Sequence, residues 1–212
     1  LCNRADAPLG ALIDQVTAAV QGRSVESRAT SAGSDDGPSP FAGLWRDPHS
    51  DAILAIEPDR GRLYLRPRPG GSGPELTIVR EGELRIGRNQ LRLANDGLHL
   101  LPVHKPEAVY VRVERVSPSA EELSEYAGSY RSDEADATWT VTVEEGQLVA
   151  RPRRSWTIRM DPTYRDGFIT DGNDLVRFTR DAAGKIDGLE VKAEFAMAEG
   201  SARLERMRFV RE

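Results

Sequence analysis

FAGLWRDPHSDAILAIEPDRGRLYLRP (residues 41–67) occurs a second time, with substitutions, as YAGSYRSDEADATWTVTVEEGQLVARP (residues 126–152). The two stretches align without a gap at a constant offset of 85, and nine of their 27 positions are identical. Many of the other positions exchange similar residues, such as Trp45 with Tyr130. A repeat of this length indicates two copies of one folded unit.

Both copies show the alternation of apolar and polar residues that is typical of β-strands. In the second copy, Trp139, Val141 and Val143 alternate with threonines. Turns at Gly61 and Gly146 separate neighbouring segments of this kind, which predicts hairpins. Consecutive hairpins without a crossover helix favour an up-and-down order. The sequence therefore predicts an all-β chain with two tandem small antiparallel up-and-down β-barrels, of about eight strands each.

The composition shifts along the chain predict its organisation. Residues 8–21 carry apolar residues three and four positions apart, which predicts one amphipathic helix ahead of the barrels. Ser119 and the acidic residues after it predict a single helical turn between the barrels, capped by Ser119. The expected segments are a helical start at 1–22, a Ser-, Gly-, Asp- and Pro-rich linker at 23–40, a first barrel at 41–116, a joint at 117–125 and a second barrel at 126–212.

The overall composition narrows the class of protein. A hydrophobic fraction of 39% and a charged fraction of 30% are typical of a soluble globular chain. The formal net charge of −5 argues against nucleic acid as a main partner. No apolar run approaches the roughly 20 residues of a membrane-spanning helix. Cys2 is the only cysteine, so no disulfide forms within the chain, and the compartment stays open between the periplasm and the cytoplasm.

The residues that usually carry catalysis or bind metals do not form a recognisable set. The three histidines, His49, His99 and His104, have no Cys/His cluster with metal-ligand spacing around them. The sequence has no G-x-S-x-G motif and no evident Ser/His/Asp arrangement. Its paired acidic residues fall in predicted linkers and turns. We therefore expect no catalytic, cofactor-binding or metal-binding site in this chain.

The most unusual loop is Arg66-Pro67-Arg68-Pro69-Gly70-Gly71-Ser72-Gly73. Its glycines resemble a phosphate-binding loop only superficially, because no Lys-Ser/Thr pair and no predicted helix follow them. Two interpretations stay open: a flexible hairpin connection, or a loop that reaches a neighbouring domain or an anionic ligand. The candidate substrate-gating residues in this loop are Arg66, Arg68, Gly70, Gly71 and Ser72.

A set of motifs in residues 122–212 resembles a known family. The motifs are Tyr126-x-Gly128-x-Tyr130, Gly146-x-Leu148, Phe178-x-Arg180-Asp181-x-x-Gly184-Lys185 and the final Arg208-Phe209. With them the segment resembles the β-barrel domain appended to serine β-lactamase-like hydrolases, a bacterial group that includes class C β-lactamase relatives, penicillin-binding esterases and D-aminopeptidases. The resemblance implies that residues 1–22 are the last strand end and C-terminal helix of such a hydrolase domain.

The catalytic motifs of that family do not occur in this sequence. Its nucleophile lies in a Ser-x-x-Lys motif, and none of Lys105, Lys185 and Lys192 has a serine three positions before it. Neither Tyr-x-Asn nor Lys-Thr-Gly occurs. The resemblance therefore implies a non-catalytic accessory region that shapes access to an active site. Its expected partner is an N-terminal serine hydrolase domain in the same, longer chain.

Two other functions stay open from the sequence. A small barrel can hold one ligand in its lumen, as lipocalins do, although a lumen filled by Trp139, Val141, Leu148 and Phe209 would argue against it. The apolar stripe of helix 8–21 could instead pair with another copy of the chain, which would make this an oligomerisation region and a homodimer.

Overall fold

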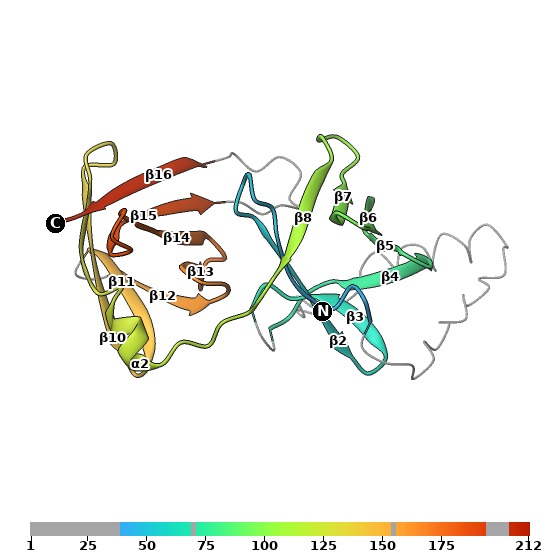
Figure 1. Cartoon of the computed structure of the whole chain (residues 1–212), viewed down its shortest axis with the longest axis horizontal. Coiled ribbons are helices and arrows are strands. Elements are labelled where there is room, and N and C mark those ends of the chain that lie inside the picture. Colours follow the sequence, from blue (N-terminus) through green and yellow to red (C-terminus); the bar gives the residue numbers. More distant parts are fainter. Residues whose placement is uncertain (1–38, 69–70, 154–155, 194–203) are drawn as a thin grey trace, which may run out of the picture. The chain divides into compact units, whose positions relative to one another are not determined.

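A computed structural model describes residues 39–68, 71–153, 156–193 and 204–212 (Figure 1). It contains two closed barrels of eight antiparallel strands. In each barrel every strand pairs with the next one along the chain, and the last strand pairs with the first. The predicted all-β, up-and-down architecture is confirmed.

The strands have the following bounds. The first barrel contains β1 (Gly43–Arg46), β2 (Ile53–Asp59), β3 (Arg62–Leu65), β4 (Glu75–Arg80), β5 (Glu83–Ile86), β6 (Asn89–Ala94), β7 (Gly97–Leu101) and β8 (Ala108–Val113). The second contains β9 (Gly128–Ser132), β10 (Ala137–Glu144), β11 (Gln147–Arg153), β12 (Trp156–Pro162), β13 (Gly167–Thr170), β14 (Leu175–Arg180), β15 (Ile186–Ala193) and β16 (Leu204–Arg211).

The predicted helix 8–21 and nearly all of the linker 23–40 lie outside the described residues. A homodimer through that helix therefore stays a prediction. The predicted helical turn in the joint is confirmed as α2 (Ala120–Ser124), where the Ser119 side chain accepts a hydrogen bond from the Glu122 backbone and the Glu122 side chain accepts one from the Ser119 backbone. No helix among the described residues is long and apolar enough to cross a bilayer.

The repeated turns predicted at Gly61 and Gly146 join β2 to β3 and β10 to β11. In the first, Asp59 pairs with Arg62 across a two-residue loop, and Arg60 and Gly61 both have positive φ, at 50° and 75°. The same loop recurs one copy later with nearly the same dihedral angles. Such turns match the right-handed twist of the strands that they join, so the hairpins are set by local sequence.

The repeated aromatic-x-Gly-x-aromatic motif closes each barrel. In the first, the Trp45 indole donates to the Phe41 carbonyl oxygen at 2.8 Å, and Arg112 of β8 donates to the Ala42 carbonyl oxygen at 2.7 Å. A Cβ on Gly43 would lie 2.7 Å from the Arg112 guanidinium, so a larger residue would displace this contact. The second barrel repeats the arrangement with its own aromatic pair and an arginine of β16. These motif residues therefore have a structural role.

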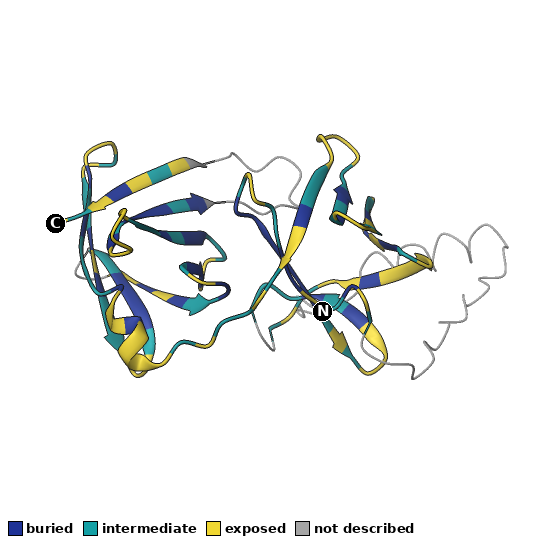
Figure 2. Cartoon of the chain, in the orientation of Figure 1, coloured by how far each residue is buried: buried dark blue, intermediate teal, exposed yellow. Residues whose placement is uncertain are grey.

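Each barrel has an apolar interior, and buried positions alternate with exposed ones along many strands (Figure 2). In the second barrel, Trp139, Val141, Leu148 and Phe209 are all buried and belong to one packed cluster. Side chains thus occupy the space that a lumenal ligand would need. This packing argues against lipocalin-like binding inside the second barrel.

Candidate functional site at the junction of the barrels

The outer face of β2 is buried against the second barrel. Both barrels belong to one compact unit of the chain. Ile53 and Ala55 of β2 lie in the same buried apolar cluster as Ile169 of β13 and Leu175 of β14. The lumen-facing residues of β2 are buried as well, so this strand has apolar surroundings on both faces. The apolar contact therefore continues from the first barrel into the second.

A buried carboxylate lies beside this contact. Asp51 lies in the connection between β1 and β2, two residues before Ile53, with a positive φ of 63°, and its side chain is only 4% exposed. Arg46 donates a hydrogen bond to it from Nε at 3.0 Å. Lys192 of β15, from the second barrel, donates to it from Nζ at 3.0 Å. One carboxylate thus accepts hydrogen bonds from both barrels.

The surroundings of Asp51 keep it ionised. Burial by itself would raise the pKa of this carboxyl. The hydrogen bonds from Arg46 and Lys192, together with the charges of Arg177 and Lys192, outweigh burial and lower the pKa below its usual value. Asp51 is therefore an anion at neutral pH, and its partners lose their counter-charge if it is removed.

The cluster around Asp51 carries more positive than negative charge. Arg177 Nε lies 3.3 Å from the Asp51 carboxylate, while Arg177 Nη2 donates to Glu190 at 2.9 Å. Arg206 approaches both acids, at 3.8 Å from Asp51 and 3.4 Å from Glu190. Four cationic side chains thus surround two carboxylates. Such a network favours one alignment of the two contacting surfaces, because each carboxylate has partners at fixed positions.

The Arg–Asp pair of this cluster has a twin in the second copy of the repeat. Arg131 Nη2 lies 2.7 Å from Asp136, which is the residue that corresponds to Asp51. The Asp136 side chain is 90% exposed, against 4% for Asp51. The local motif is therefore the same in both barrels, and only the first copy is covered by a neighbouring barrel.

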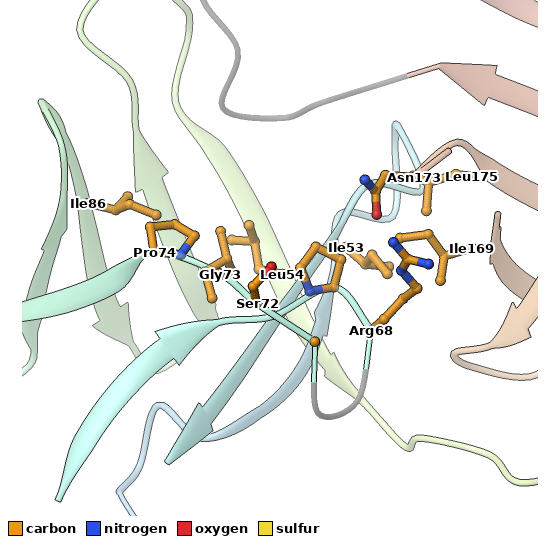
Figure 3. Close-up of a pocket in the computed structure, with 13 residues that line it drawn as sticks. Ile53, Leu54, Arg68, Ser72, Gly73, Pro74, Ile86, Ile169, Asn173 and Leu175 are labelled. Atoms are coloured by element: carbon orange, nitrogen blue, oxygen red, sulfur yellow. The ribbon is translucent and has the colours of Figure 1, made fainter. Parts of the chain in front are cut away.

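A pocket of about 330 Å³ opens at the same junction (Figure 3). Its aliphatic lining comes from both barrels: Ile53, Leu54, Leu65, Ile86, Ile169 and Leu175. Arg68, Ser72 and Asn173 supply side-chain polar atoms. Concave apolar pockets with a few polar groups are the usual form of small-molecule sites, so this is the candidate binding site of the chain.

The pocket brings together some of the loop residues singled out from the sequence. Arg68, Gly71 and Ser72 line it. Arg66 is held elsewhere, since it donates to Asp59 at 2.9 Å and its guanidinium stacks on the Tyr64 ring. Gly70 lies outside the described residues. The loop thus contributes one cationic side chain to the pocket, Arg68.

The return of this loop to β4 depends on Gly73. A Cβ at this position would lie 1.8 Å from the Leu65 carbonyl oxygen, an impossible contact. The Pro74 carbonyl oxygen next to it accepts the hydrogen bond from the Leu65 backbone N–H at 3.0 Å. The absence of a side chain at position 73 therefore lets the loop close against β3 and form one wall of the pocket.

The histidines do not create a metal site in the described part of the chain. No group of three or more His, Cys, Asp or Glu side chains is placed to hold an ion there. His99 instead bridges two carboxylates, with Nε2 at 2.8 Å from Asp96 and Nδ1 at 2.5 Å from Glu107. The hydrogen bond to Asp96, and to a smaller extent the one to Glu107, raises the pKa of His99. This arrangement is a surface ion pair of the first barrel.

Three residues of the second barrel line the pocket without having been predicted from the sequence: Ile169, Asn173 and Leu175. A comparison of the two copies contains a signal for the contact. The outward positions Leu44, Ile53 and Ala55 are apolar in the first copy and are Ser129, Thr138 and Thr140 in the second. An apolar outer face predicts a covering partner, whereas a hydroxyl-rich face is typical of exposure. The identity of the partner residues carries no such signal.

Comparison with known proteins adds a family and several relatives. Residues 113–206 match the family model described as "Domain of unknown function (DUF3471)". The D-aminopeptidase of Brucella ovis is 30% identical over 165 residues, which cover 70% of this chain and 30% of that protein. The D-aminopeptidase of Brucella anthropi is 32% identical over 105 residues, covering 49% of this chain and 19% of that protein. The chain thus spans less than a third of the length of these relatives.

Proposed function

We propose that this chain, which carries a DUF3471 domain and is related to the D-aminopeptidases, is a non-catalytic accessory region of a serine β-lactamase-like peptidase or esterase. The observation that carries the proposal is the similarity to D-aminopeptidases over 165 residues, more than either barrel alone contains. The aligned part makes up 30% of the relative, so most of that protein has no aligned counterpart in this chain. We place the catalytic domain in such a segment, ahead of the barrels.

The chemistry of the repeat supports an accessory role. The nucleophile motif Ser-x-x-Lys does not occur in the sequence. The residues that make the repeat recognisable, such as Gly43, Trp45 and Tyr130, form the barrel closures instead of a reactive site. A duplicated closed barrel is a rigid support, and rigid supports are where loops that modify a neighbouring site are found. The two barrels are thus suited to position loops beside a catalytic domain.

The activity of the chain tests this proposal. We expect the 212-residue chain to leave nitrocefin, p-nitrophenyl esters and D-amino-acid amides unhydrolysed, whereas a longer protein that contains it hydrolyses at least one of the three. The longer protein with its Ser-x-x-Lys serine replaced by alanine is the control for background hydrolysis. Turnover by the 212-residue chain above that background would overturn the accessory role.

We also propose that the loop from Arg66 to Pro74 restricts the substrates of the catalytic domain. Arg68 and Ser72 are its candidate contacts, since neither side chain has a hydrogen-bond or ion-pair partner among the described residues. In the longer protein, Arg68→Ala combined with Ser72→Ala should change the ratio of kcat/KM between a small and a bulky amide substrate by about tenfold, the effect of losing one charged contact.

Arg88→Ala is the matched control for the loop, because Arg88 is an exposed arginine in a turn of the same barrel. It should leave the ratio of kcat/KM unchanged. Equal ratios for the loop variant and the control, over several substrates, would rule out the gating role while leaving the accessory role intact.

A further inference from the structure

We propose that the junction pocket binds a small molecule with an apolar body and a single carboxylate, of the size of a medium-chain alkanoate. The inference goes beyond the accessory role, because it concerns a site formed by the two barrels themselves. It rests on the size of the pocket, on its lining and on the Arg68 guanidinium that faces it.

The size of the pocket limits its ligand. Its volume of about 330 Å³ lies at the lower end of ligand pockets, which span about 300–1,000 Å³. Leu54 and Leu65 of the first barrel line it with aliphatic side chains, and Figure 3 shows Ile86 and Pro74 at the end of the pocket away from Asn173. A short alkyl chain or a small ring fits this end, whereas a two-chain lipid exceeds the volume.

The charge of the pocket selects an anion. The Arg68 side chain lines it and has no hydrogen-bond or ion-pair partner among the described residues. A guanidinium beside aliphatic side chains is partly removed from water and is stabilised by a counter-ion. Its planar fork matches the two oxygens of a carboxylate. None of the described residues that line the pocket is acidic, so nothing there would pair with an amino group.

The second barrel completes the polar end. Asn173 has a positive φ of 68° in the connection between β13 and β14, and its side chain lines the pocket. Figure 3 shows the Arg68 side chain extending toward the end of the pocket where Asn173, Ile169 and Leu175 lie. The carboxylate is therefore placed between Arg68 and Asn173, which donate to it from different barrels. The alkyl chain then runs toward Ile86.

Titration with octanoate tests the proposal on the 212-residue chain. Isothermal titration calorimetry should show saturable binding at one site per chain. Arg68→Gln should weaken binding about tenfold or more, because a hydrogen-bonded charge pair is lost. Arg88→Gln, which removes an exposed arginine outside the pocket, should bind octanoate as tightly as the unsubstituted 212-residue chain does. Thermal unfolding of each variant establishes that it is folded.

A second variant and two further probes separate the alternatives. Ser72→Trp places a large side chain at the exposed rim and should abolish binding while leaving Arg68 in place. Octylamine should fail to bind, and 1-octanol should bind about tenfold more weakly than octanoate. Absence of saturable octanoate binding, equal affinity of octanol and octanoate, or unchanged binding by Arg68→Gln or Ser72→Trp would overturn the proposal. None of these outcomes depends on hydrolase activity, so failure here leaves the accessory role standing.

Discussion

Asp51 and Asp136 occupy the same position in two copies of one motif, and each is paired with the corresponding arginine. Both have positive φ, at 63° and 44°. Only Asp51 is covered by the other barrel, where Lys192 and Arg177 add to its partners. How much the aspartate at this motif position contributes to stability therefore depends on whether the other barrel covers it.

Asp51→Asn should lower the free energy of unfolding by about 2 kcal/mol. Breaking a fully buried pair costs about 3–5 kcal/mol, and the cost is smaller here because the Arg46 and Arg177 side chains are 25% and 32% exposed. Asparagine tolerates positive φ, so the backbone is retained. Urea denaturation measures the change. Asp136→Asn is the matched control and should stay within about 0.5 kcal/mol of the parent chain.

The effect of Asp51→Asn should depend on pH. The pKa of Asp51 is lowered in the folded chain, so its contribution is fully present above the unfolded value of about 3.9 and is lost as the pH falls through the lower folded value. The difference in stability between the parent chain and the variant should be largest near pH 7 and shrink below about pH 4. A difference that grows on acidification would contradict the pairing described for Asp51.

Strands β2 and β10 show the same contrast at the scale of an element. They occupy equivalent places in the two barrels and pair with their neighbours in the same order. The first four residues of β2 are all buried, whereas in β10 the buried Trp139 and Val141 alternate with Thr138 and Thr140, which are partly exposed or exposed. Strand β2 thus has apolar surroundings on both of its faces, whereas β10 has them on one face only.

Ile53→Thr should destabilise the chain by about 1–2 kcal/mol, because it removes buried aliphatic surface at the junction and buries a hydroxyl. The reciprocal change Thr138→Ile, at the equivalent place in β10, should alter stability by no more than about 0.5 kcal/mol. Urea denaturation of both variants provides the comparison. Equal losses for the two would show that the outer face of β2 contributes no more than that of β10.

At the scale of the whole molecule, the two barrels combine local symmetry with one asymmetric contact. The closure of each barrel uses the same aromatic, glycine and arginine positions, so the barrels form as equivalent units. The junction uses different residues from each: the β1–β2 side of the first and residues of β13 to β16 of the second. The pocket is lined by residues of both barrels, so ligand binding there would require the two barrels to be in contact.

Much of this architecture was predictable from the sequence because it rests on short-range patterns. The 85-residue offset indicated two units, alternation indicated strands, and Gly61 and Gly146 indicated the turns. Ser119 indicated its capped helical turn. The strand, turn and cap signals depend on residues within a few positions of one another, where backbone geometry and local hydrogen bonds decide the conformation.

By itself, the sequence determined that the chain is a duplicated antiparallel up-and-down barrel. Only the tertiary structure decided that Lys192 and Arg177 meet Asp51, and that Arg68 and Asn173 line one pocket. These pairs are separated by more than 100 positions. Their proximity results from the packing of two closed surfaces, and packing between distant elements leaves no pattern in the sequence that identifies the residues of the partner.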